Sequence, residues 1–181
     1  MSIGTLALRI TVGGFVAAHG LQKLRGAFGG PGLAGTEKMM DSMGMRPAPL
    51  QARAVALTET VGGLALAAGA ATPVAAAGIV GAMTTAIRKV HLGNGPWNSK
   101  GGYEFNAVLI AAAVAIASDG PGVISLDALA GKRTWGVLGG LFALGAGVAA
   151  SFALTEVSRR LAPAEDEAVT EAEVAAEGDL A

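Results

Sequence analysis

Four ionisable residues lie within apolar stretches of the amino-terminal half of the chain, in places from which hydrocarbon would exclude them. Arg9, His19 and Lys23 interrupt the first apolar stretch, and Glu59 interrupts the second. Ionisable residues at bilayer depth usually face protein or water and have partners. Arg9 and Glu59 are the deepest of the four, and we expect them to form a buried ion pair. The pair would either fix helix packing or take part in proton transfer or head-group binding, and the sequence leaves both open.

A second polar group flanks the loop between the third and fourth apolar stretches. We expect the cations Lys23, Arg88 and Lys89 to extend to lipid phosphates. For His19, Glu104 and Asn106, near the same membrane face, a buried polar cluster is the better interpretation. The candidate polar or ligand-binding residues are Arg9, His19, Lys23, Glu59, His91, Tyr103, Glu104 and Asn106. None of them is assigned a catalytic role from the sequence.

The composition predicts a membrane protein. Of the 181 residues, 52% are hydrophobic and 15% are charged, whereas soluble domains carry about 25% charged residues. The chain has no cysteine, which excludes disulfides, CxxC redox chemistry and thiolate metal sites. With two histidines and no ligand spacing, we expect neither haem nor a bound metal. Nothing in the sequence predicts a nucleic-acid partner.

The string GPGLAG at 30–35 matches the G-x-G-x-x-G pattern of dinucleotide-binding loops. That fingerprint needs a preceding strand and a βαβ unit. Here the string follows an apolar helix, and no βαβ pattern occurs in the chain. We therefore interpret Phe28 to Gly32 as a tight re-entry turn whose glycines adopt positive φ. Thr36 would then cap a short helix on the membrane surface.

Apolar stretches of suitable length predict five membrane-spanning helices, because a span needs roughly 20 mainly apolar residues. The absence of basic residues in MSIGTLAL argues against a signal peptide, so the first stretch is expected to remain as a helix. The segment GAATP divides the long apolar region after Glu59 into two helices, since glycine ends a helix and proline suits a first turn. The expected helices are 3–24, 52–70, 73–90, 102–118 and 135–154.

The basic residues predict the orientation. Ten Lys and Arg residues lie on one side of the expected spans and two, Lys132 and Arg133, lie on the other. The positive-inside rule then places the amino terminus outside and the carboxyl terminus in the cytoplasm of a bacterial cell membrane. The chain divides into a four-helix membrane bundle (1–130), an additional transmembrane helix (131–158) and an acidic tail (159–181) that we expect to be disordered.

Several motifs carry a family resemblance. The order and spacing of R…GGFVAAHGLQKL…FGGPGLAGT, TETVGGLALAAG, GGYEFN and DGPGVISLD resemble the DoxX family of small bacterial membrane proteins, over about residues 4 to 127. The resemblance implies a four-helix membrane bundle related to a membrane subunit of thiosulfate:quinone oxidoreductase, with links to oxidative-stress defence. The extra helix and the tail depart from the family pattern, and the absence of cysteine argues against sulfur chemistry by this chain.

Two functions follow as expectations. The first is a membrane subunit of an oxidoreductase or oxidative-stress system, with a quinone or lipid-head-group pocket near the cytoplasmic face and protein partners of a membrane redox complex. In it, His19 would donate a hydrogen bond or shuttle a proton, Glu59 would accept protons, and Arg9 would be the counter-charge. The alternative is a non-catalytic scaffold that docks on a larger respiratory complex through the fifth helix and the tail.

Overall fold

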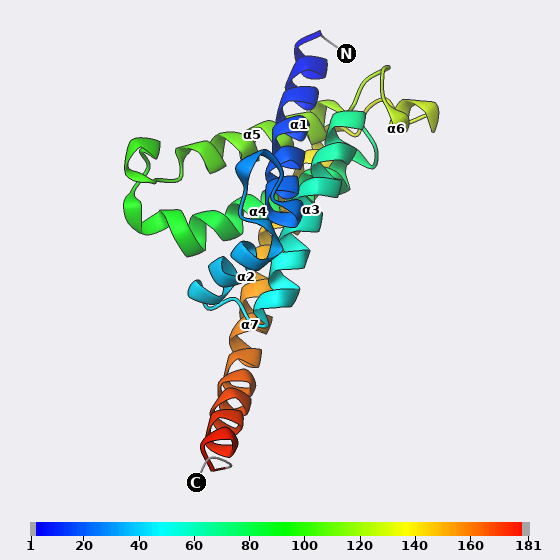
Figure 1. Cartoon of the computed structure of the whole chain (residues 1–181). Helices are drawn as coiled ribbons and strands as arrows, with labels where there is room; N and C mark the ends of the chain where they lie inside the picture. Colours follow the sequence, from blue (N-terminus) through cyan, green and yellow to red (C-terminus); the bar gives the residue numbers. More distant parts are fainter. Residues whose placement is uncertain (1–2, 179–181) are drawn as a thin grey trace.

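The fold is all-helical. The computed structural model describes the backbone of residues 3–178 and the side chains of residues 3–162, and no strand occurs in this part of the chain. Two short helices, α2 (Gly32–Ser42) and α6 (Leu126–Leu129), lie in the connections. A π-helical turn (Ile87–His91) continues α4. The long helices are α1 (Ile3–Arg25), α3 (Ala48–Ala68), α4 (Thr72–Ala86), α5 (Glu104–Asp119) and α7 (Gly136–Gly178), arranged as Figure 1 shows.

Two helical segments are long and apolar enough to cross a membrane, Ile3–Arg25 and Gly136–Ala162, among the residues described. The helices α4 and α5 have 15 and 16 residues, or about 23 Å each at 1.5 Å per residue. This is shorter than the roughly 30 Å hydrocarbon core of a bilayer. The count of five crossings therefore stays a prediction. The first turn of α1 and the last turns of α7 lie at opposite ends of the molecule (Figure 1).

The sequence signals at the α3–α4 junction act as expected. Gly69 follows α3 with φ of 65°, and the amide of Ala70 donates to the carbonyl of Ala65 at 2.8 Å. This is the usual way in which a glycine in the left-handed region ends a helix. Pro73 lies in the first turn of α4. GAATP therefore divides the apolar region into two helices.

The helices α1 and α3 touch backbone to backbone. A Cβ atom added at Gly13 would lie 2.5 Å from the backbone nitrogen of Ala67 and 2.6 Å from the carbonyl oxygen of Gly63. A Cβ added at Gly20 would collide with Thr60 in the same way. Small residues at helix contacts allow such close approach in membrane proteins. Glycines therefore fix the spacing and the register of this antiparallel pair.

The additional helix α7 is packed within the bundle. A Cβ added at Gly139 would lie 2.6 Å from the carbonyl oxygen of Ala117 in α5, and one at Gly147 would lie 2.6 Å from that of Ala77 in α4. Its side chain Ala143 joins the buried apolar cluster that α1, α3, α4 and α5 share. The first half of α7 is thus part of the core rather than an appendage.

The helical backbone of α7 continues through Gly178. The expected disorder of the acidic tail (159–181) stays a prediction, and residues 179–181 lie outside the part of the chain that the structure describes. The segment after Ala162 consists mainly of alanine and glutamate, which are strong helix formers, and acidity alone does not break a helix. In Figure 1 this part of α7 extends beyond the other helices.

The turn after α1 has the expected glycine conformations. Gly29 and Gly32 have φ of 75° and 65°, which confirms the turn and its use of positive φ. The expected cap at Thr36 is wrong, because α2 begins at Gly32. Thr36 is buried inside that helix, and its hydroxyl donates to the carbonyl of Gly32 at 2.7 Å.

Arg9 holds together the end of the bundle where α3 stops. It is 3% exposed. Its guanidinium donates to the carbonyl of Ala67 at 3.0 Å, to that of Pro121, and to that of Ile124 at 2.6 Å. The last carbonyls of a helix have no partner within it, and Arg9 supplies one for α3. A single cation therefore joins α1, the end of α3 and the α5–α6 loop.

Asp127 of α6 performs the complementary task at the start of α4. Its carboxylate accepts hydrogen bonds from the amides of Ala71 at 2.7 Å and Thr72 at 3.0 Å, and from the Thr72 hydroxyl at 2.8 Å. The indole of Trp135 donates to it at 3.2 Å. Partial burial by itself would raise the pKa of Asp127, but the hydrogen bonds from Thr72, Ala71 and Trp135 outweigh it and hold the pKa below the ordinary 3.8.

The glycine contact between α1 and α3 can be tested with neighbouring residues. Gly13→Ala should lower the free energy of unfolding by roughly 1–3 kcal/mol, because the new methyl group meets backbone atoms that cannot rotate away. Gly14→Ala is the matched control, since a Cβ there has nothing within 4 Å. Unfolding of both variants in detergent, followed by circular dichroism, checks this. Equal stability of the two would contradict the packing.

Asp127→Asn should destabilise the protein by roughly 1–2 kcal/mol at pH 7, since hydrogen bonds to a charged acceptor are lost. The lowered pKa means that the carboxylate stabilises the fold fully above the unfolded-state value near 3.8, and that this contribution disappears as the pH falls below it. The stability difference between the wild type and the variant should therefore shrink below about pH 4. Thermal unfolding at pH 7 and at pH 3.5 measures it, and a difference independent of pH would refute the ionised cap.

Candidate functional site

A cavity of about 580 Å³ lies at the end of the bundle opposite to Arg9 and Asp127. Its wall combines the carboxyl-terminal half of α1, α2 and the loop after it, the first half of α3, the end of α4, the start of α5 and the middle of α7. The lining is mainly apolar, with a few polar groups. Sites for small molecules have volumes of roughly 300–1,000 Å³ and this kind of lining, so the cavity is the candidate ligand site.

An ion pair between Lys23 and Glu59 forms part of the wall. The Glu59 side chain is 5% exposed and that of Lys23 is 20% exposed. The expected pair between Arg9 and Glu59 is wrong. In the antiparallel register that the glycines set, Thr60 lies level with Gly20, so Glu59 meets the last turns of α1 and not its first.

Methionines make up much of the rest of the wall. Five of the six methionines in the chain line the cavity, namely Met39, Met40, Met43, Met45 and Met83. Met40 and Met45 are buried in a small apolar cluster with Ala48 and Ala52 of α3. The amide nitrogen of Asn106 lies 3.4 Å from the sulfur of Met83. The methionines of α2 thus face the bundle, and the sequence analysis did not assign them to a site.

Both histidines line the cavity from its more exposed side. The Nδ1 atom of His19 lies 2.9 Å from Oε1 of Gln22, its neighbour on α1. The Nδ1 atom of His91 lies 2.7 Å from the carbonyl oxygen of Gly101. Because a carbonyl only accepts, Nδ1 of His91 must donate this bond, which leaves its Nε2 as the free ring atom.

The structure brings five of the eight candidate residues together. His19, Lys23, Glu59, His91 and Asn106 line the cavity. Arg9 lies at the other end of the bundle. Glu104 is the first residue of α5, and its carboxylate accepts a hydrogen bond from the amide of Asn98, in the loop before the helix, at 2.7 Å. Tyr103 is half-buried beside it. Glu104 and Tyr103 lie outside the lining of the cavity.

Gln51 is a cavity residue that the sequence analysis missed. It is 4% exposed, and its Nε2 donates to the carbonyl of Arg46 at 3.2 Å. Its Oε1 is buried without a hydrogen-bond partner, alone in this among the side chains of residues 3–162. The expected helix began at 52, whereas α3 begins at Ala48. The sequence could have indicated Gln51 as a site residue, because Gln51 and Glu59 are eight residues apart and so share a face of a helix.

The cations after α4 have hydrogen-bond partners within the protein. Arg88 donates to the carbonyl and hydroxyl of Ser151, both at 3.2 Å, and to the hydroxyl of Thr155 at 3.1 Å. Its guanidinium lies 3.7 Å from the centre of the Phe152 ring. The expectation of lipid contact is wrong for Arg88 because α7 packs against α4 and offers these acceptors.

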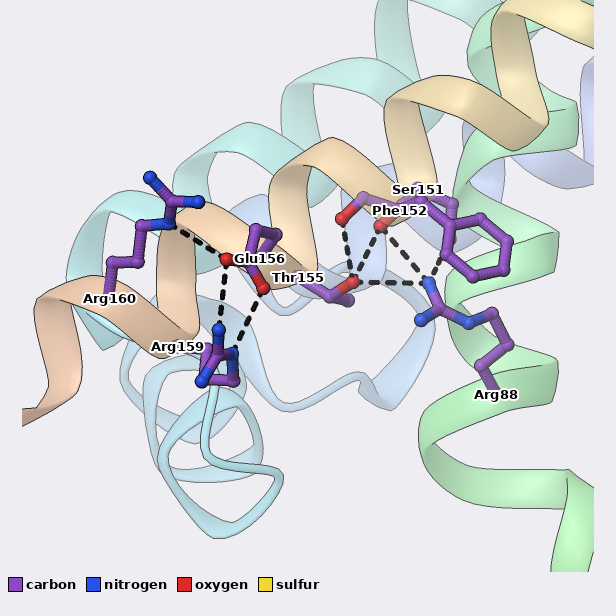
Figure 2. A network of polar contacts seen from close by, with 7 residues as sticks. All are labelled: Arg88, Ser151, Phe152, Thr155, Glu156, Arg159 and Arg160. Atoms are coloured by element: carbon purple, nitrogen blue, oxygen red, sulfur yellow. Dashed lines mark hydrogen bonds and ion pairs between the residues drawn. The ribbon is translucent and has the colours of Figure 1, made fainter.

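Figure 2 shows how this contact continues along α7. Arg88 reaches across from the end of α4, and one turn further on Glu156 holds Arg159 and Arg160. The ammonium of Lys89 donates to the carbonyl of Met43 at 3.3 Å. With Lys23 bound to Glu59, all three of the cations that were expected to reach lipid phosphates have protein partners.

The comparisons with known proteins bear on the segment that carries most of the cavity. Residues 4–92 match the DoxX family model, and DoxX is a family of membrane proteins. No curated protein and no solved structure matches the chain. The matched segment includes the contact of α1 with α3, the pair of Lys23 and Glu59, and the methionines, and it ends before α5 and α7. With an all-helical fold, this match over residues 4–92 supports the assignment of the chain to the DoxX family.

Proposed function

We propose that the chain is a multi-pass membrane subunit of an oxidoreductase system and that its cavity binds a ligand of the quinone type. The observation that supports this most is the cavity itself, whose mainly apolar wall carries an ion pair and a few other polar side chains. A quinone has the same character, with an apolar ring and tail and two polar oxygens. Membership of the DoxX family supports the association with oxidoreductase systems.

The binding of Lys23 and Arg88 to protein partners favours a quinone over an anionic lipid head group. A phosphate would need free positive charge in the wall. Lys23 is bound to Glu59, and Arg88 is bound to α7. Glu59 already neutralises the charge of Lys23, and a phosphate would have to draw Arg88 away from α7. The remaining N–H groups of the Lys23 ammonium can still donate to the oxygen of a neutral ligand.

Each candidate residue then has a role in binding. Lys23, held in place by Glu59, points an ammonium group at the cavity where a quinone oxygen can accept a hydrogen bond. His19 lies at the more exposed edge, where an imidazole can exchange protons with water. In the orientation that the basic residues predict, this end of the bundle faces the cytoplasm, and the amino terminus lies outside the cell membrane.

The alternative function is a scaffold subunit that docks on a membrane redox complex. One observation favours it, namely the continuation of α7 beyond the other helices (Figure 1). One face of the first half of α7 packs against α5 and α4 through Gly139, Gly147 and Ser151, whereas Leu138 and Leu141 on its other face are exposed. Docking through α7 can therefore use this exposed face or the segment after Ala162.

Ligand binding can be tested by filling the cavity. Ala54→Phe places a ring in the wall of α3 and should weaken binding of a short-tailed benzoquinone by at least about tenfold, because volume needed by the ligand is lost. Ala68→Phe, on the exposed face at the other end of α3, is the matched control. Equilibrium dialysis of purified protein in mild detergent measures both. Equal affinity of the two variants would show that the quinone binds elsewhere or without specificity.

The scaffold alternative predicts that truncation after Ala162 removes copurifying membrane proteins while the bundle stays folded. Deletion from residue 134 would be a poor test, since it strips α4 and α5 of their partner. Mass spectrometry of gently purified full-length and truncated protein, with unfolding in detergent as a check of the fold, makes the comparison. Full retention of partners by the truncated chain would exclude docking through this segment.

A further inference from the structure

Methionine is unevenly distributed in this chain. Four of the six methionines lie between Met39 and Met45, in the run MMDSMGM at the end of α2 and just after it. The buried apolar cluster that the long helices share consists of valine, leucine, isoleucine and alanine together with Met83. Most of the core is therefore filled by other residues, and thioether groups are concentrated in one part of the cavity wall.

The end of α2 brings three of these thioethers together. The amide of Met45 donates to the carbonyl of Met40 at 2.9 Å. The amide of Gly44, whose φ is 64°, donates to the carbonyl of Asp41 at 2.9 Å. These are the two hydrogen bonds of a Schellman motif, which turns the chain back so that the residue after the glycine contacts the last turn of the helix. Met40 and Met45 are accordingly buried in one cluster, and Met43 packs against it.

This methionine cluster, Met40, Met43 and Met45, is accessible to a small ion. All three side chains line the cavity, and Met43 is half-buried. Met39, beside them on α2, also lines the cavity and is 37% exposed. A methionine side chain has three rotatable bonds, so its sulfur atom can turn toward a bound ion while the backbone stays in place. The three sulfur atoms can therefore bind one ion together.

We propose that the methionine cluster binds a soft monovalent cation, Cu(I). Thioether sulfur is a soft, uncharged ligand, and soft ligands select Cu(I) over hard cations. In the part of the chain that the structure describes, no group of three or more histidine, aspartate or glutamate side chains is arranged to hold a metal. The ligands that zinc and calcium prefer are therefore not gathered there. The expectation that no metal binds was based on histidine and cysteine, and thioethers are ligands of another kind.

The charges beside the cluster favour a monovalent ion. The carboxylate of Asp41 is paired with Arg46, and the ammonium of Lys89 donates to the carbonyl of Met43 at 3.3 Å. A bound cation therefore adds positive charge to a wall that is mainly apolar. The cost of moving an ion from water into such surroundings rises steeply with its charge, so Cu(I) fits better than a divalent metal. This site does not depend on the proposed quinone ligand.

The test uses purified protein in mild detergent, without oxygen, and Cu(I) supplied in competition with a chromophoric chelator that reports the free metal. The wild type should bind a single equivalent of Cu(I). Met40→Leu, Met43→Leu and Met45→Leu should each weaken binding by at least about tenfold, because one of three ligands is lost. Met83→Leu is the matched control, since it removes a thioether from the same cavity but outside the cluster. It should bind Cu(I) as tightly as the wild type.

Two further measurements complete the experiment. Leucine has nearly the volume of methionine, so the variants should stay folded, and unfolding in detergent checks this. X-ray absorption at the copper edge, on the wild type alone, should show sulfur neighbours. Three outcomes would overturn the proposal: no binding of Cu(I) by the wild type, a copper shell of nitrogen and oxygen only, or a loss of affinity in Met83→Leu as large as in the cluster variants.

Discussion

The contact between the backbones of α1 and α3 determines where every other group of the molecule lies. Because Gly13 and Gly20 have no side chain, the two helices approach until the atoms of their peptide groups touch. At that distance the helices cannot slide past each other without collision. The register is therefore fixed, and it brings Arg9 to the carbonyl of Ala67 and Lys23 to Glu59. Arg9 and Lys23, both in α1, thus bind groups at opposite ends of the bundle.

Charge in this molecule is satisfied within the protein wherever it is buried. Arg9 binds backbone carbonyls, Asp127 binds backbone amides, and Arg88 binds hydroxyl groups of α7. Each of these charged groups joins a helix end to a segment far away in the sequence, so its hydrogen bonds hold separate helices together. The cavity differs because its wall is mainly apolar and encloses a volume that the side chains leave unfilled, which marks it as the place where something other than the chain belongs.

Much of the fold could be predicted from the sequence, because apolar length and the glycine–proline signal between α3 and α4 are local properties. The first four long helices lie close to their expected positions, α7 begins where the fifth was expected but continues well past 154, and the glycine turn after α1 is as expected. Pairing was harder to predict. The partner of Glu59 depends on the register of two helices, which no local signal gives, and the partners of Arg88 depend on α7 packing against α4. Gln51 was missed because the start of α3 was placed after it.

The wall of the cavity has two unlike parts, the flexible methionines and a few polar side chains that are held in place. The methionine side chains are unbranched and have three rotatable bonds, so a wall built from them adjusts to the outline of whatever it touches. The amide of Gln51 and the pair of Lys23 and Glu59 are held in place by other groups of the protein. Ligand recognition in such a cavity depends on the polar groups at one edge of the ligand and tolerates variation in the size of its apolar part. Ring substitution and tail length of a bound ligand should therefore matter less to this protein than the polar groups that the ligand presents at that edge.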